Sequence, residues 1–268
     1  RLRDQLTRGP VAATVQTSVT TDLYELPCPV GRIEGRESDR YVVVGNHVDS
    51  WHEGVTDNAT AVAVTLELAR VFSARDTQPR RGLVFGFWTA HSFGRYAGST
   101  WFADTNFTDL RENGIAYLHL DLNGLRGADT LWYQHMAAVA EEHRDVLAAV
   151  PDLERPADSE ATNESEQSSF LGDERPGRNS DQSFWGAGLV SLLSGARLTP
   201  GTDDGGPVGG GWWWHTPADT RDKVDPDVLS EETKLYVALL ARLCESPVVP
   251  VDHAASAAAV AEAVDALG

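Results

Sequence analysis

The chain has 268 residues, 41% of them hydrophobic, and its 22 basic against 40 acidic residues give a net charge of −18. This charge repels nucleic acids and anionic membrane surfaces, so it argues against a nucleic-acid-binding protein. No apolar run approaches the roughly 18 residues that a transmembrane helix needs. Two cysteines are too few for a disulfide framework or a cysteine-rich zinc site. We therefore expect one α/β domain, in which histidines and carboxylates would hold any metal.

The basic residues are unevenly chosen. Lys223 and Lys234 are the only lysines, and the other 20 basic residues are arginines. Together with the acidic surplus, this predicts a halophilic protein of the cytoplasm, where salt screens the self-repulsion; a GC-rich genome would also favour arginine. The chain begins without Met and ends inside an alanine-rich helical pattern, so we expect it to be part of a longer protein. The absence of a signal peptide from this sequence therefore proves nothing.

Apolar runs rich in β-branched and aromatic residues alternate with helical patterns, which is typical of a sheet covered by helices. The run at 41–44 is almost continuously apolar, as in a strand that is buried on both faces. The predicted strands are 11–19, 26–33, 41–46, 82–89, 116–122, 130–134 and 189–193. Helical spacing of apolar residues predicts helices at 58–74, 136–150 and 226–243.

Two segments depart from this alternation. Between 151 and 178 the composition shifts to Asp, Glu, Ser, Asn and Pro, which predicts an acidic surface insertion. Further on, six glycines between 201 and 211 precede three consecutive tryptophans, 212–214. Such a loop can move but ends in rigid aromatic surface, which would need a ligand or a partner if it were exposed.

A histidine and a carboxylate follow the strand at 41–46. Residues two apart in an extended segment point to the same side, so His47 and Asp49 emerge together. A metal site in which Asp49 orients His47 would use this geometry, and a solvated turn is the alternative. Asp57 is expected at the start of the next helix, where the positive helix end favours a carboxylate; a plain helix cap would also explain it.

Further candidate ligands follow later in the chain. Asp121 ends another predicted strand, and His215 follows the glycine-rich loop. Open α/β sheets place their sites at such strand ends and loops. His119 shares a strand side with Asp121, so it is either a substitute ligand or a half-buried strand histidine.

Five motifs in this order resemble the M28 zinc peptidases, in particular the branch that includes glutamate carboxypeptidase II and the transferrin receptor. The resemblance covers about 41–253. Its motifs are VVGNHVDSW at 43–51, TDNATA at 56–61, FWTA at 87–90 followed by GS at 98–99, LD at 120–121, and HTPADT at 215–220. The tail PVVPVD at 247–252 also looks like the entry to that branch's C-terminal helical region.

The resemblance implies a zinc-exopeptidase fold of the phosphorylase/hydrolase-like type. This is an α/β three-layer sandwich with a mixed central sheet, and its metal lies at the C-terminal ends of the central strands. The peptidase domain would span 1–252, and 253–268 would begin the C-terminal helical region, through which two copies could form a homodimer.

Carried over position by position, the family pattern implies a metal on His47 and Asp121, a second metal on His215, Asp57 bridging both, and Asp49 behind His47. Two Zn2+ ions about 3.5 to 4 Å apart activate water and polarise a peptide carbonyl. The implied activity is therefore hydrolysis of a peptide or related amide bond, by an amino- or carboxypeptidase that uses one or two zinc ions.

This sequence departs from the family where two consecutive glutamates, a general base and a ligand, normally follow the strand at 83–89. Here His91 and Ser92 stand there, and the stretch before Gly98 is one residue longer than usual. His91 could accept the proton of the attacking water. It could instead join Asp57 and His215 on the second metal. Otherwise hydrolysis is lost and the domain is a silent binding or scaffold module; a single-zinc acyltransferase like the glutaminyl cyclases is a further alternative.

Three residues are candidates for contacting the substrate. Trp214 directly precedes the last ligand, so its indole N–H could donate to a developing oxyanion, or the tryptophans could simply close the pocket floor. Arg95 could pair with a substrate carboxylate or lie on a solvated face. Asp181 opens a segment that borders the site in this family, which makes it a positioning candidate.

Overall fold

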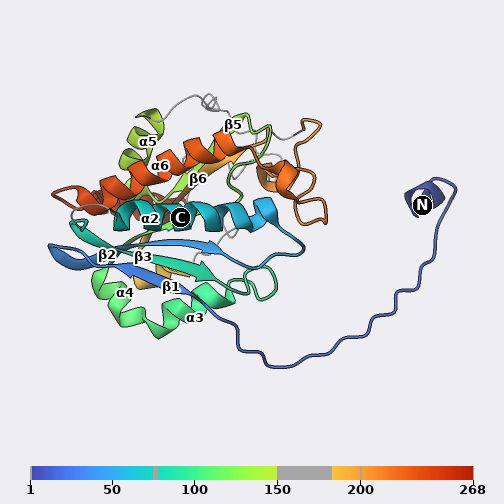
Figure 1. Ribbon diagram of the computed structural model, residues 1–268, viewed down its shortest axis with the longest axis horizontal. Helices are drawn as coiled ribbons and strands as arrows, with labels where there is room; N and C mark the ends of the chain where they lie inside the picture. Colours follow the sequence, from blue (N-terminus) through green and yellow to red (C-terminus); the bar gives the residue numbers. More distant parts are fainter. Residues whose placement is uncertain (1, 75–77, 150–182, 200, 268) are drawn as a thin grey trace.

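The computed structural model describes residues 2–74, 78–149, 183–199 and 201–267 (Figure 1). Within these residues, six strands form one mixed sheet in the order β1-β3-β2-β4-β6-β5. Strands β3, β2, β4 and β6 are parallel, and the edge strands β1 and β5 are antiparallel to their neighbours. The strands are β1 (Val30–Ile33), β2 (Ser38–His47), β3 (Arg81–Trp88), β4 (Gly114–His119), β5 (Thr130–His135) and β6 (Val190–Arg197).

Helices cover both faces of this sheet, which confirms the predicted three-layer α/β fold (Figure 1). One face carries α2 (Thr60–Ser73), α5 (Ala140–Ala149) and α6 (Pro226–Glu245). The other face carries α3 (Ala97–Thr105) and α4 (Phe107–Asn113). In the part of the chain that the structure describes, none of the helices combines the length and apolarity that crossing a bilayer requires.

Successive residues of β2 fill the two cores in turn. Val42 and Val44 pack in the cluster under α2 and α6, whereas Tyr41 and Val43 pack on the α3 and α4 side. This alternation is why the run at 41–44 is continuously apolar. Burying each such side chain contributes about 1.5 to 3 kcal/mol.

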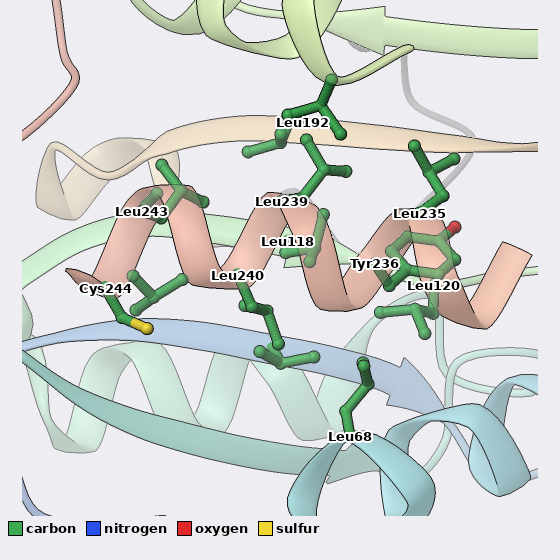
Figure 2. Close-up of a cluster of buried hydrophobic side chains, with 14 of the residues drawn as sticks. Leu68, Leu118, Leu120, Leu192, Leu235, Tyr236, Leu239, Leu240, Leu243 and Cys244 are labelled. Carbon is green, nitrogen blue, oxygen red and sulfur yellow. The ribbon is translucent and has the colours of Figure 1, made fainter. Parts of the chain in front are cut away.

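The larger core lies between the sheet and α6. Figure 2 shows Leu239 and Leu240 of α6 in one cluster with Leu118 and Leu120 from the end of β4 and with Leu68 of α2. Helix α6 begins with Pro226, and the Asp225 side chain caps it by accepting the backbone N–H groups of Asp227 and Val228. The predicted helix at 226–243 is therefore confirmed and extends two residues further.

The strand predicted at 11–19 is wrong, and the strand predicted at 26–33 shrinks to β1. Residues 10–27 run without regular structure away from the body of the domain, and Val15 and Val19 are exposed (Figure 1). Alternating Val and Thr suit a strand, but a strand forms only when a neighbour accepts its backbone hydrogen bonds. No described strand pairs with this segment.

Both chain ends carry helices, α1 (Leu2–Leu6) and α7 (His253–Asp265). The Asp252 side chain caps α7 by accepting the N–H groups of Ala254 and Ala255. The predicted helix at 136–150 appears as a short turn, Ala137–Val139, followed by α5. The predicted acidic insertion at 151–178 lies outside the described residues, and the limits proposed for the peptidase domain stay a prediction.

Parallel pairing brings the functional segments to one edge. Strands β2, β3 and β4 run in the same direction, so their C-terminal ends meet there. His47 is the last residue of β2, His91 follows β3, and Asp121 follows β4. The candidate residues of three separated motifs are thereby brought together, as expected for an open α/β sheet.

Candidate metal and catalytic site

His47 lies at the centre of the site with only 1% of its side chain exposed. Its Nδ1–H donates to the backbone carbonyl of Asp49 at 2.8 Å. Its Nε2 therefore faces the two carboxylates, 3.1 Å from Oδ1 of Asp57 and 3.5 Å from Oδ1 of Asp121. This is the orientation in which a histidine presents Nε2 to a metal.

Asp57 lies between two imidazoles. Its Oδ1 faces His47, and its Oδ2 lies 2.8 Å from Nε2 of His215. The residue sits in a short irregular turn, η1 (Val55–Ala59), that precedes α2 and makes no side-chain cap. Its backbone is not helical there (φ −126°, ψ 79°), which contradicts the plain-cap interpretation. Asp57 has the geometry of a carboxylate that bridges two cation positions.

A buried carboxylate that sequence analysis missed holds this turn in place. Asp219 accepts the backbone N–H groups of Thr56 at 2.8 Å and Asp57 at 3.0 Å, and also the hydroxyl of Thr56 at 2.7 Å. Trp213 donates its indole N–H to the same hydroxyl. The position of Asp219 four residues after His215, inside HTPADT, was the available signal.

The pKa values of the three central groups show that this cluster favours positive charge. Burial alone would lower the pKa of His47, but Asp121 and Asp57 beside it raise that pKa well above its ordinary value. Burial would raise the pKa of Asp121, yet His47 and His119 hold it well below its usual range. Burial also opposes ionisation of Asp57, but His215 and His47 lower its pKa. A proton on His47 occupies the place that suits a cation.

Unsatisfied buried atoms support the same conclusion. Nε2 of His47, Nε2 of His119 and Oδ1 of Asp121 make no well-formed hydrogen bond within the described residues. Buried polar atoms almost always have a partner, so such a cluster needs an explanation. Ligand atoms of His47, His91 and Asp121 lie within 4.8 Å of one another, and imidazole with carboxylate is a donor set that suits zinc.

His91 is held by Asp49. The carboxylate of Asp49 accepts the backbone N–H groups of His91 at 3.0 Å and Ser92 at 2.7 Å, whereas its Oδ1 is 3.8 Å from Nδ1 of His47. Asp49 thus orients His47 through its carbonyl and anchors the loop after β3 through its side chain. The His91 ring stacks on His47, so it groups with His47 and Asp121 instead of with Asp57 and His215.

A cleft of about 310 Å³ opens over these groups. Both Arg95 and Trp214 line it; Arg95 is exposed, and the Trp214 ring stacks on His215 with centroids 3.6 Å apart. Asp181 lies outside the described residues, so its predicted positioning role stays a prediction.

Two exposed aromatic side chains stand beside the cleft: Trp51 lines it, and Phe93 contacts Trp51. Trp51 and Phe93 are 49% and 65% exposed and meet edge to face with ring centroids 5.3 Å apart. Trp51 lies 5.9 Å from the ring of His215. The three tryptophans at 212–214 do not form one exposed aromatic surface. Trp213 is buried, and Trp212 is exposed beside the Lys223 amine.

Comparison with known proteins agrees with this architecture. The model of Peptidase family M28 matches residues 30–240. Among curated relatives, Aminopeptidase NAALADL1 of Mus musculus is 40% identical over 99 residues, which are 35% of this chain and 13% of that protein. Transferrin receptor protein 2 of Homo sapiens is 39% identical over 103 residues, 37% of this chain and 13% of that protein. The chain thus spans only a small part of the length of these relatives.

Solved structures share the fold. BSAP, a zinc aminopeptidase from Bacillus subtilis, superposes with a TM-score of 0.62 and 20% identity over 84% of this chain and 52% of that one. Since the family model covers most of the chain, including the motifs that meet at the cleft, the chain belongs to Peptidase family M28.

Proposed function

We propose that this chain forms the catalytic domain of a zinc-dependent exopeptidase that hydrolyses a peptide or related amide bond. The observation that carries the proposal is the convergence of three histidines and two carboxylates on one cleft, with buried ligand atoms that lack hydrogen-bond partners within the described residues. The family membership and the aminopeptidases among its relatives support the same activity.

The residues divide into two metal positions. His47, Asp121 and His91 would hold one zinc ion, and His215 would hold a second, with Asp57 between the two. Bound zinc supplies Lewis-acid chemistry, because it polarises a carbonyl and lowers the pKa of a water molecule. In this proposal the His91 imidazole stands where the family has its consecutive glutamates and acts as a ligand of the first zinc ion.

Protein groups around the metal positions would orient the substrate. Stacking on His215 fixes the Trp214 ring at the cleft, where its indole N–H can donate to the oxygen that gains charge during amide hydrolysis. Arg95 at the rim can pair with a substrate carboxylate, with little cost of desolvation because the guanidinium is exposed. Trp51 and Phe93 offer apolar surface to a large substrate side chain next to the scissile bond.

A substrate panel tests the activity. Aminoacyl-p-nitroanilides and N-acylated dipeptides would be offered to the zinc-loaded protein and to protein treated with a chelator. We expect turnover of at least one class, its loss with the chelator and its return with zinc. Zinc that is bound at stoichiometric levels without turnover of any substrate would contradict the proposal.

One observation favours a second candidate, a catalytically silent binding domain. The carboxylates among the described residues that line the cleft are Asp57 and Asp121, both of which face histidines as ligands would. No further carboxylate in this described lining stands ready to accept a proton. The same panel separates the two functions, since a silent domain binds zinc and does not hydrolyse.

A further inference from the structure

The side chain of Asn58 binds the backbone on both sides of Asp121. Its Oδ1 accepts the backbone N–H of Leu122 at 3.2 Å, and its Nδ2 donates to the backbone carbonyl of Leu120 at 3.3 Å. Asn58, Leu120 and Leu122 are all buried. A single buried amide thus spans the segment that carries a proposed zinc ligand.

The orientation of this amide follows from its two partners. A backbone N–H only donates, so the atom of Asn58 that meets Leu122 must be the oxygen. A backbone carbonyl only accepts, so the atom that meets Leu120 must be the nitrogen. An apolar side chain in place of Asn58 would leave both of these buried backbone groups without this partner, which is costly in the interior of a protein.

Leu122 requires such support, because its backbone lies in the left-handed region with a φ of 55°. A residue with a Cβ atom seldom adopts this conformation, which persists only where the surroundings hold it. Asn58 binds the N–H of Leu122, and Arg197 donates to the carbonyl of Leu122 at 3.0 Å and to that of Asp121 at 2.9 Å. Two side chains from distant segments therefore fix the backbone that carries Asp121.

The place of Asn58 in the chain distinguishes it from Arg197. It directly follows Asp57, the proposed bridging carboxylate, in the turn η1. Asp57 and Asp121 both face Nε2 of His47, at 3.1 Å and 3.5 Å. The amide of Asn58 therefore ties the segment of one proposed ligand to the segment of the other.

We propose that Asn58 is a positioning residue for Asp121. Its amide holds Leu120 and Leu122, and the Asp121 carboxylate between them stays directed at the metal position beside His47. The inference deepens the proposed function, because it rests on Asp121 being a zinc ligand. Residues that orient a ligand without touching the metal typically change metal affinity about 10- to 100-fold when they are removed.

The first test examines the Leu122 hydrogen bond in metal-free protein. Hydrogen exchange followed by NMR should show a slowly exchanging Leu122 amide in the unmodified protein and exchange at least about 10-fold faster in Asn58→Ala. The Leu118 amide inside β4 should exchange equally slowly in both proteins, which excludes general unfolding. Asn58→Asp keeps the shape and the acceptor oxygen, so its Leu122 amide should stay protected. Fast exchange of the Leu122 amide in the unmodified protein would overturn the proposal.

The second test is a double-mutant cycle on zinc affinity, measured by competition with a chromophoric chelator. Asn58→Ala alone should raise the Kd for zinc about 10- to 100-fold. In an Asp121→Ala background the same substitution should change Kd less than about threefold, because the ligand that Asn58 positions is absent. An unchanged Kd in folded Asn58→Ala would overturn the inference. An equal factor in both backgrounds would also overturn it, since Asn58 would then act on the fold in general or on Asp57.

Asn106→Ala is the matched control. Asn106 also donates its side-chain amide to a backbone carbonyl, that of Phe102 at 2.9 Å, but it lies between α3 and α4, on the other face of the sheet from α2. Its Kd for zinc should equal that of the unmodified protein. Circular dichroism and urea unfolding check that each variant folds. If Asn58→Ala does not fold, Asn58→Ser takes its place in the cycle, with the same expected result.

The two tests also separate this inference from the proposed function. An unmodified protein that takes up no zinc contradicts the proposed function, and the exchange of the Leu122 amide then decides by itself whether Asn58 holds the segment of Asp121. Zinc uptake combined with equal factors in the two backgrounds contradicts the inference alone.

Discussion

The imidazole of His91 lies flat on the imidazole of His47, with ring centroids 3.9 Å apart and planes inclined by 9°. Two features hold it there: the Asp49 carboxylate binds the backbone N–H groups of His91 and Ser92, and the Tyr96 ring meets His91 at 4.9 Å. A side chain placed this firmly against a proposed ligand is well positioned to share its metal.

We predict that His91→Ala weakens zinc binding about 100-fold or more, because a three-residue ligand set loses one donor. Elemental analysis after dialysis and chelator competition measure the effect. Ser92→Ala is the control, since Ser92 shares the loop and lines the same cleft. Unchanged zinc content with lost turnover would instead assign His91 the role of proton acceptor.

Asp219 gives a second prediction. Its carboxylate accepts three hydrogen bonds from Thr56 and Asp57 while it is buried. Asp219→Asn places an amide N–H₂ against at least one of these donors, so we expect a loss of about 1 to 3 kcal/mol in the free energy of unfolding and weaker zinc binding. Urea unfolding measures the first quantity. The exposed Asp222→Asn serves as the control, and equal stability of the two variants would contradict the role of Asp219.

Much of this site could be predicted from residue type and spacing. His47, Asp57, Asp121 and His215 come from four separate motifs, and the structure brings all four to one sheet edge, because parallel strands end together. The tertiary partners could not be predicted. That the Asp49 carboxylate would bind the loop after β3, or that Asp219 would hold Asp57, depends on contacts between distant segments, for which a single sequence carries no pattern.

The same limit explains the errors in the fold. Helix α3 was not predicted because its Gly98, Ser99 and Thr100 are poor helix formers, and helix α4, with seven residues, is too short to show a helical period. Packing against the sheet stabilises both helices. The burial of His119 could not be predicted either. Its position two residues before Asp121 suggested a ligand or a half-buried strand histidine, whereas the structure buries its side chain completely, with Nδ1 2.8 Å from the Tyr117 hydroxyl.

A third prediction concerns acid stability. His143 is buried, with Nδ1 3.1 Å from Nδ1 of His135 and Nε2 3.3 Å from the Ser194 hydroxyl. Burial first, and then the charges of His135 and Arg144, lower the pKa of His143 from 6.5 to about 3. Between about pH 3 and pH 6.5 the unfolded chain therefore binds a proton at His143 that the folded chain does not bind. The stability present above pH 6.5 is lost as the pH falls towards 3, at a rate of at most about 1.4 kcal/mol per pH unit.

The free energy of unfolding, measured against pH with a chelator present, checks this sign. In His143→Gln the curve should be flatter between pH 6.5 and 3 than in the unmodified protein, whereas the exposed His253→Gln should leave it unchanged. Parallel curves for all three proteins would show that His143 does not control this loss.

A fourth prediction concerns substrate preference. Trp51 comes from the segment after β2 and Phe93 from the loop after β3, and their rings meet beside the cleft, with Trp51 next to His215. A large apolar side chain of the substrate would cover both rings, and removing one ring would forfeit about 1 kcal/mol or more of that contact.

We expect Trp51→Ala and Phe93→Ala to raise KM about 5- to 10-fold for a substrate with leucine or phenylalanine at the cleaved position. For the matching alanine substrate KM should change less than twofold. For Phe93→Ala, kcat should stay near its original value with both substrates, because the Phe93 ring meets Trp51, whose own ring is the one beside the proposed ligand His215. Trp101→Ala, which removes another exposed tryptophan, from α3, controls for general loss of aromatic surface. An equal rise in KM for the leucine and alanine substrates would mean that these rings shape this side of the cleft without selecting a side chain.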